Sequence, residues 1–301
     1  MVGAALAALL ASHPLTSSLR TLLLDQQPQQ LSWQHKPVPE LRVSTVTPAS
    51  IACLEQAGAW KHILPHAASF ETMQVWDTAG PGCLRWHAGD VGQSRMGVVA
   101  ENSLITGSLM TALGQAAQAR GQPLVLDPSL PLRLEPGVSC MWPTSVQHMT
   151  LPHAATTGPS ASPITPQAGE GLVELELQGG IRLRSRLVVA ADGSNSRVRQ
   201  LAGLRTLGWN YNQRGLVATV KLAGGGTGTA WQRFLPTGPL ALLPVRDGLA
   251  NVVWSTSPQM ASELERMGPQ DFAQAVNKAL NSPNVNDDSR SWSQPLSGLM
   301  Q

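Results

Sequence analysis

The stretch at residues 187–199 constrains the fold most, because a short apolar run ends there abruptly in Asp192 and Gly193. A short run with β-branched residues is typical of a parallel strand that is buried on both faces. Asp192 would then lie at the carboxyl edge of a sheet, where open α/β sheets bind ligands. Gly193 lets a ligand approach the backbone closely, and the small polar residues 194–196 can cap a following helix. The pattern predicts a strand, a turn and a helix whose free amides face an anion such as a pyrophosphate.

Two roles are open for Asp192 at this turn. Its carboxylate would repel a phosphate, so the expected partners are sugar hydroxyls, backbone amides or a bridging water molecule. The simpler interpretation is an Asp-Gly turn after a core strand, in which Asp192 only caps the helix.

The rest of the chain shows two kinds of architecture, and its 301 residues are enough for one large or two ordinary domains. Helices alternate with strands in the first part, whereas antiparallel strands separated by Gly/Pro turns fill the last third. We therefore expect one α/β layer system from residues 1–66 and 96–205. A second, antiparallel sheet is expected from residues 67–95 and 206–301. Residues 136–169 are rich in Pro, Ser, Thr, Ala and Gly, which predicts a long flexible loop.

The N-terminal residues match the latter half of a dinucleotide-binding βαβ unit. An apolar helix that begins near Gly3 precedes a short strand that ends at Asp25, about 20 residues further on. Gly3 would be the last glycine of G-x-G-x-x-G, and Asp25 would accept hydrogen bonds from an adenosine ribose. Arg42 precedes a Ser-Thr loop, where it can pair with a cofactor phosphate or with a surface carboxylate. The first strand of such a unit does not precede Met1, and no Arg-rich transit segment is found at this end.

Composition narrows the classes of function. A net charge of +2 gives no electrostatic reason to expect nucleic acid as a partner. The three cysteines form neither a C-x-x-C pair nor an even disulfide framework, which fits a reducing compartment. Neither they nor the histidines show metal-ligand spacing, so no metal site is expected. No run of about 18 apolar residues is present, so no membrane-spanning helix is expected.

Four further segments complete a specific resemblance. They are residues 74–77 (QVWD), 209–211 (WNY), 230–244 (AWQRFLPTGPLALLP) and 253–256 (VWST). Together with the Asp-Gly pair at residues 192–193, they span most of the chain. The sequence resembles the FAD-dependent aromatic hydroxylases of the p-hydroxybenzoate hydroxylase type, in particular their mitochondrial ubiquinone-biosynthesis branch. The fold implied is a Rossmann-like FAD-binding domain interleaved with a β-sheet substrate-binding domain.

The resemblance also implies a cofactor and a reaction. FAD would be bound by Gly3, Asp25, Arg42, Asp192 and Gly193. The implied reaction is ring hydroxylation of a polyprenyl-hydroxybenzoate with O2 and an electron donor, either NADPH or a ferredoxin system. No side chain is expected to act as a catalytic residue, because the flavin carries the chemistry. Peripheral association with the matrix side of the mitochondrial inner membrane, and contact with other ubiquinone-biosynthesis proteins, are implied as well.

Two features of the family are missing, namely its first strand with the early glycines and its later Gly-Asp motif. The fold is therefore expected to be incomplete, and the alternative function is a catalytically inactive isoform or remnant that acts at most as a binding partner. A polyprenyl tail would need an apolar channel. Trp209, Trp231, Leu242 and Trp254 are candidates for its lining, although residues at these spacings are more often plain core.

Overall fold

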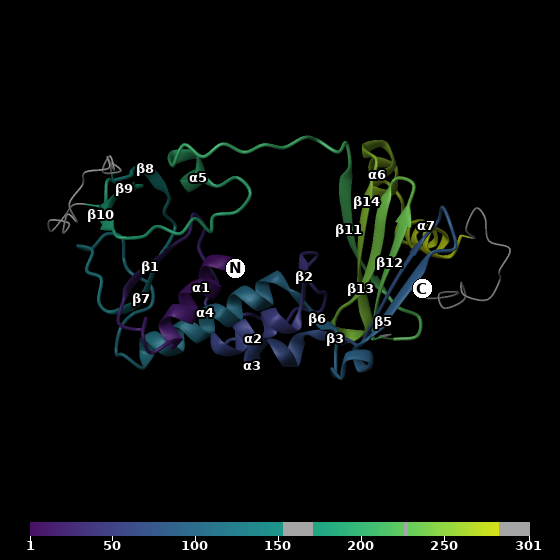
Figure 1. Ribbon diagram of the computed structural model, residues 1–301, viewed down its shortest axis with the longest axis horizontal. Coiled ribbons are helices and arrows are strands. Elements are labelled where there is room, and N and C mark those ends of the chain that lie inside the picture. Colours follow the sequence, from purple (N-terminus) through teal and green to yellow (C-terminus); the bar gives the residue numbers. More distant parts are fainter. Residues whose placement is uncertain (153–170, 226–227, 283–301) are drawn as a thin grey trace, which may run out of the picture. The chain divides into compact units, whose positions relative to one another are not determined.

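The computed structural model describes residues 1–152, 171–225 and 228–282, and the chain divides into two compact units (Figure 1). Unit 1 contains Met1–Ser32 and Leu109–Gly208, whereas unit 2 contains Trp33–Ser108 and the residues from Trp209 onward. The sequence led us to expect divisions near residues 66, 96 and 205, and the structure divides the chain after residues 32, 108 and 208. The assignment of cofactor binding to one part and substrate binding to the other stays a prediction.

Unit 1 contains two small sheets. In the first, β1 pairs with β7 in parallel. In the second, which is antiparallel, β9 lies between β10 and β8. Ala4, Ala7 and Ala8 are buried on α1, because small side chains allow a helix to pack closely. The elements of unit 1 are α1 (Val2–Ser12), β1 (Arg20–Leu24), β7 (Gly137–Met141), β8 (Val146–Thr150), β9 (Val173–Leu177), β10 (Arg182–Ser185), α5 (Arg197–Leu201) and the last part of α4 (Asn102–Gln118).

The expectation of a flexible loop over residues 136–169 is wrong for its first half, which contains β7 and β8. Every residue of β7 is buried, so this strand has no alternation of polar and apolar residues that would signal it in the sequence. Residues 153–169 lie outside the described residues.

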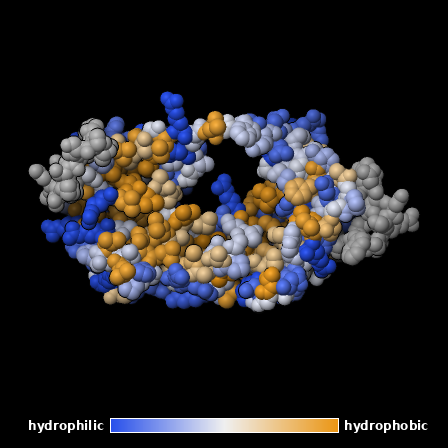
Figure 2. Space-filling view, in the orientation of Figure 1, coloured by the Kyte–Doolittle hydropathy of each residue, from blue (hydrophilic) through white to orange (hydrophobic). Residues whose placement is uncertain are grey.

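The expectation of a buried strand at residues 187–191 is also wrong. The segment forms no ladder with any strand in the described part of the chain, and Leu187 and Val189 are 74% and 54% exposed. A strand requires a partner for its backbone hydrogen bonds, and β1 has its ladder with β7 instead. Figure 2 shows hydrophobic residues at the surface of unit 1 around α1 and β1.

The main body of unit 2 is a six-stranded sheet in the order β11-β14-β13-β12-β4-β5. All neighbours are antiparallel except β4 and β12, which pair in parallel with Gln74 opposite Trp231. Two segments that are far apart in the sequence are thus adjacent strands, as expected. The strands are β4 (Thr72–Asp77), β5 (Cys83–His87), β11 (Arg214–Lys221), β12 (Thr229–Leu235), β13 (Gly238–Pro244) and β14 (Leu249–Thr256), with the short helix η3 (Arg246–Gly248) between the last two.

Helices α6 (Pro258–Glu265) and α7 (Pro269–Asn281) cover one face of this sheet (Figure 1). Gly268 and Pro269 separate the two helices, because proline favours the first turn of a new helix. The core between sheet and helices contains Leu222, Trp231, Leu240, Leu242, Ala250, Val252, Trp254, Leu264, Val276 and Leu280.

A small antiparallel sheet in the order β2-β6-β3 completes unit 2. The Thr47 hydroxyl caps helix α2 by accepting a hydrogen bond from the Ser50 amide. None of the helices in the described residues has the length and hydrophobicity that a membrane span needs. These elements are β2 (Val43–Val46), α2 (Pro48–Gln56), α3 (Trp60–Ile63), η1 (Leu64–His66), β3 (Ala68–Phe70), η2 (Ala88–Val91) and β6 (Gly97–Glu101).

Candidate cofactor-binding site

The Asp192 carboxylate holds the turn that leads into α5. One oxygen accepts from the Ser196 hydroxyl at 2.5 Å, and the other accepts from the amides of Arg197 and Val198 at 2.7 and 3.1 Å. The Ser196 hydroxyl in turn accepts from the Arg199 amide at 3.0 Å. Burial raises the pKa of Asp192, but these hydrogen bonds outweigh it and the pKa is lowered. The Asp192 side chain therefore caps the helix, as in the simpler interpretation.

This capping changes what the turn can bind. Three first-turn amides of α5 already have partners within the turn, so the expectation that they face a pyrophosphate is wrong. Gly193 differs from them. It has φ of +84°, a Cβ built there would meet nothing within 4 Å, and its amide has no partner among the described residues. The open part of the turn is thus the backbone at Gly193, where a ligand can approach closely.

Gly3 lies in the first turn of α1, where the helix closely approaches two other segments of unit 1. A Cβ at Gly3 would lie 3.3 Å from both the Ala191 Cβ and the Leu23 Cδ1. The structure therefore brings Gly3 next to the residue that precedes Asp192. Close packing of helix on strand is the role of the last glycine in a dinucleotide-binding fingerprint. No side chain of the described residues caps α1, so the N–H groups of its first turn can donate to other partners.

Asp25 directly follows β1 and is half buried. Its backbone is fixed by the ladder with β7, and its carbonyl accepts from the Thr144 amide at 2.9 Å. One carboxylate oxygen accepts from the Gln27 amide at 2.9 Å, which closes a turn. The second oxygen has no protein partner in the described residues, so it can accept from a ligand hydroxyl.

Arg42 belongs to unit 2, immediately before β2. Its carbonyl accepts from the Asn102 amide at 2.9 Å, which fixes its backbone. Its side chain is exposed, and its guanidinium has no partner among the described residues. Of the two roles that the sequence left open, pairing with a surface carboxylate is not observed there.

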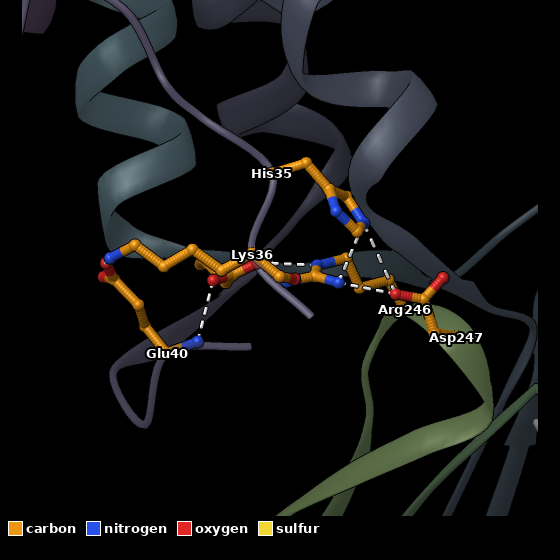
Figure 3. A network of polar contacts seen from close by, with 6 residues as sticks. His35, Lys36, Glu40, Arg246 and Asp247 are labelled. Carbon is orange, nitrogen blue, oxygen red and sulfur yellow. Dashed lines mark hydrogen bonds and ion pairs between the residues drawn. The ribbon is translucent and has the colours of Figure 1, made fainter. Parts of the chain in front are cut away.

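Sequence reasoning missed a buried network in unit 2, centred on Arg246 in η3 (Figure 3). Its guanidinium donates to Glu101 at 2.8 Å and to the Lys36 carbonyl at 2.6 Å. Its Nη1 also lies 3.0 Å from the Nε2 of His35. Burial lowers the pKa of Arg246, but its bonds to Glu101 and Asp247 outweigh this and the pKa is raised. Because Glu101 and Arg246 are 145 residues apart, no local sequence pattern announces the pair.

The four channel candidates do not line one surface. Trp231, Leu242 and Trp254 are buried in the core beneath α6 and α7, whereas Trp209 is 72% exposed outside that core. The channel that they were expected to line is therefore not formed by these residues. Other hydrophobic residues of this sheet are instead exposed on its opposite face. These are Leu84 and Trp86 of β5, Val217 of β11 and Phe234 of β12.

Comparison with known proteins shows which proteins this chain resembles. It is 35% identical over 287 residues to the mitochondrial ubiquinone biosynthesis monooxygenase COQ6 of Xenopus tropicalis, with 93% of this chain and 54% of that protein covered. It is 29% identical over 268 residues to the 3-demethoxyubiquinol 3-hydroxylase of Escherichia coli, covering 89% of this chain and 58% of that protein. This chain is similar in sequence to the ubiquinone biosynthesis monooxygenases. It spans about half the length of these curated relatives.

A family profile described as an FAD binding domain matches residues 165–296, which include Asp192 and Gly193. Among solved structures, PqsL of Pseudomonas aeruginosa, a probable FAD-dependent monooxygenase, superposes with a TM-score of 0.63 at 18% identity. That match covers 93% of this chain and 64% of PqsL, and at this identity it shows the fold alone. The predicted fold class, an FAD-binding α/β fold with additional sheets, is confirmed, and the family match supports FAD as the cofactor.

Proposed function

We propose that this chain forms part of an FAD-dependent monooxygenase that hydroxylates an aromatic ring in ubiquinone biosynthesis. The observation that carries the proposal is the open backbone turn at Gly193, in a chain 35% identical to a ubiquinone biosynthesis monooxygenase. When bound, the flavin supplies the oxygen-activating chemistry, so the protein has to bind and orient the reactants. No observation favours the alternative of an inactive remnant.

In this proposal, each site residue has a role that suits its surroundings. Gly193 offers its backbone amide to the cofactor, and Gly3 lets the uncapped end of α1 lie close to Ala191 and Leu23. The second carboxylate oxygen of Asp25 accepts from a ribose hydroxyl, and the guanidinium of Arg42 pairs with a phosphate. Asp192 acts indirectly, since its carboxylate holds the turn in which Gly193 lies.

The substrate proposed is a phenol with a polyprenyl tail, together with O2 and an electron donor, either NADPH or a ferredoxin system. The exposed hydrophobic face of the six-stranded sheet supports this choice, because an apolar surface favours contact with an aromatic ring or an isoprenoid chain. The relative from Xenopus is named as mitochondrial. We propose the same compartment for this chain, at the matrix side of the inner membrane and in contact with other ubiquinone-biosynthesis proteins.

The experiment is an FAD titration of the purified chain, followed by flavin absorbance at about 450 nm and by fluorescence quenching. Gly193→Ala is compared with Gly203→Ala, a matched control. Gly203 also has a positive φ, of +70°, and space for a Cβ, so both variants introduce similar backbone strain. We expect FAD to bind the wild-type and Gly203→Ala chains, and to bind Gly193→Ala at least about tenfold more weakly, the ratio for a difference of 1.4 kcal/mol. Equal affinity for both variants, or no binding at all, would contradict the proposal.

A further inference from the structure

The segment between Trp33 and Arg42 contains no helix or strand, yet its backbone is fixed at several points within unit 2. Irregular segments are ordinarily the mobile parts of a domain. Here, four backbone groups of the segment form hydrogen bonds with groups outside it. These bonds join Arg246 Nη2 to the Lys36 carbonyl at 2.6 Å, the Glu40 amide to Glu101 Oε2 at 2.7 Å, Asn251 Nδ2 to the Leu41 carbonyl at 3.1 Å, and the Asn102 amide to the Arg42 carbonyl at 2.9 Å.

Arg246 is the centre of these contacts. Its side chain is 6% exposed, and its Nε donates to Glu101, whose side chain is 4% exposed. Its guanidinium carbon lies 5.9 Å from the centre of the Trp33 ring, and its Nη1 lies 3.0 Å from His35 Nε2. It also pairs with the neighbouring Asp247. Figure 3 shows His35 of the segment and Asp247 of η3 beside Arg246.

Such a network is weak evidence of a gain in stability. Removing two charges from water costs free energy that a buried ion pair often only offsets. What the network does provide is a defined conformation, since the planar guanidinium places its donors in fixed directions toward Glu101 and Lys36. The same Glu101 side chain binds the Glu40 amide, close to the end of the segment where Arg42 lies. Arg42 then carries an exposed guanidinium on a fixed backbone.

We propose that Arg246 is a positioning residue, which acts through Glu101 and the backbone of the segment so that Arg42 presents its guanidinium to a cofactor phosphate. The inference rests on the proposed function, under which FAD is the ligand. It adds to that proposal that Arg246 raises the affinity for the cofactor without touching it. A guanidinium on a fixed backbone loses less conformational entropy on binding than one on a mobile loop.

The test is a double-mutant cycle on FAD affinity with the full chain. Arg42→Gln, Arg246→Gln and the double variant are titrated with FAD, and Arg266→Gln controls for the loss of one exposed positive charge. We expect Arg42→Gln to weaken binding about ten- to a hundredfold, the range for a charged hydrogen bond. Arg246→Gln is expected to weaken it about five- to thirtyfold, and to have no further effect when residue 42 is already Gln. Amide hydrogen exchange at residues 36–41 should speed up in Arg246→Gln without FAD present.

The following results show whether the positioning role of Arg246 fails alone or together with the proposed function. FAD affinity that changes less than twofold in Arg246→Gln, or an equal loss with and without Arg42, would overturn the positioning role alone. Unchanged hydrogen exchange at residues 36–41 would overturn it too. If the wild-type chain binds no FAD, the proposed function fails and the positioning role fails with it. Should Arg246→Gln not fold, Arg246→Lys replaces it in the cycle. It keeps the buried charge but cannot reach Glu101 and the Lys36 carbonyl together.

Discussion

Replacing Asp192 tests whether this acid belongs to the protein's own structure or to its ligand. The carboxylate accepts three hydrogen bonds within the turn, two of them from first-turn amides of α5. Loss of a helix-capping side chain costs about 0.5–2 kcal/mol. Because α5 has only five residues, few other interactions of the helix can offset this loss. We expect Asp192→Ala to lower the free energy of unfolding of unit 1 by about 1–2 kcal/mol. Asp192→Asn should cost less, because its amide oxygen can still accept from Arg197 and Val198.

The assay combines urea unfolding with hydrogen exchange at residues 197–201, at pH 7 and at acid pH. The pKa of Asp192 is lowered below its ordinary value of 3.8, so its contribution is present above that pH and is lost as the pH falls through the lowered value. The difference between wild type and Asp192→Asn should therefore shrink only below about pH 4. Asp192→Asn should also keep its affinity for FAD. Two results together would refute the capping role: unchanged stability and hydrogen exchange in Asp192→Ala, and loss of FAD binding in Asp192→Asn. They would indicate that the carboxylate binds FAD instead.

Three other predictions follow from the packing. Gly3→Val should destabilise unit 1 by about 1–3 kcal/mol in urea unfolding, because a side chain there overpacks against neighbours 3.3 Å from a Cβ. Thiol titration of the native chain at pH 8 should find Cys53 and Cys83 reactive and Cys140 protected, since burial raises the pKa of Cys140 to about 12. Arg233→Met should loosen α7, detected as faster hydrogen exchange there, because the buried guanidinium donates to the carbonyls of Ala279 and Ser282.

The sequence identified the elements whose signal is local. The alternation of Val173, Leu175 and Leu177 with two glutamates is typical of a half-buried strand such as β9, and the glycines after it are typical of a hairpin turn. The spacing from Gly3 to Asp25 predicted α1 followed by β1. These patterns succeed because the side chains that set them are neighbours along the chain.

The features that sequence reasoning missed depend on distant partners. β7 is buried at every position, so its pattern matches neither a half-buried strand nor a helix. Residues 187–191 have a strand-like composition, but a ladder also needs a second strand, which composition cannot supply. The pair of Arg246 with Glu101 joins η3 to the end of β6, and neither residue stands in a motif.

The carboxylates named above mainly stabilise the protein's own turns, whereas other groups remain available to bind a ligand. Asp192 uses both carboxylate oxygens, and Asp25 one of its two, to order their own turns. Among the described residues, the Gly193 amide and the first amides of α1 in unit 1, and separately the guanidinium of Arg42 in unit 2, stay available to anions. Each of these groups attracts a phosphate, whereas a carboxylate that faced a phosphate would repel it. Substitutions of Asp192 should therefore act mainly on stability, whereas substitutions at Gly193 and Arg42 should act mainly on cofactor affinity.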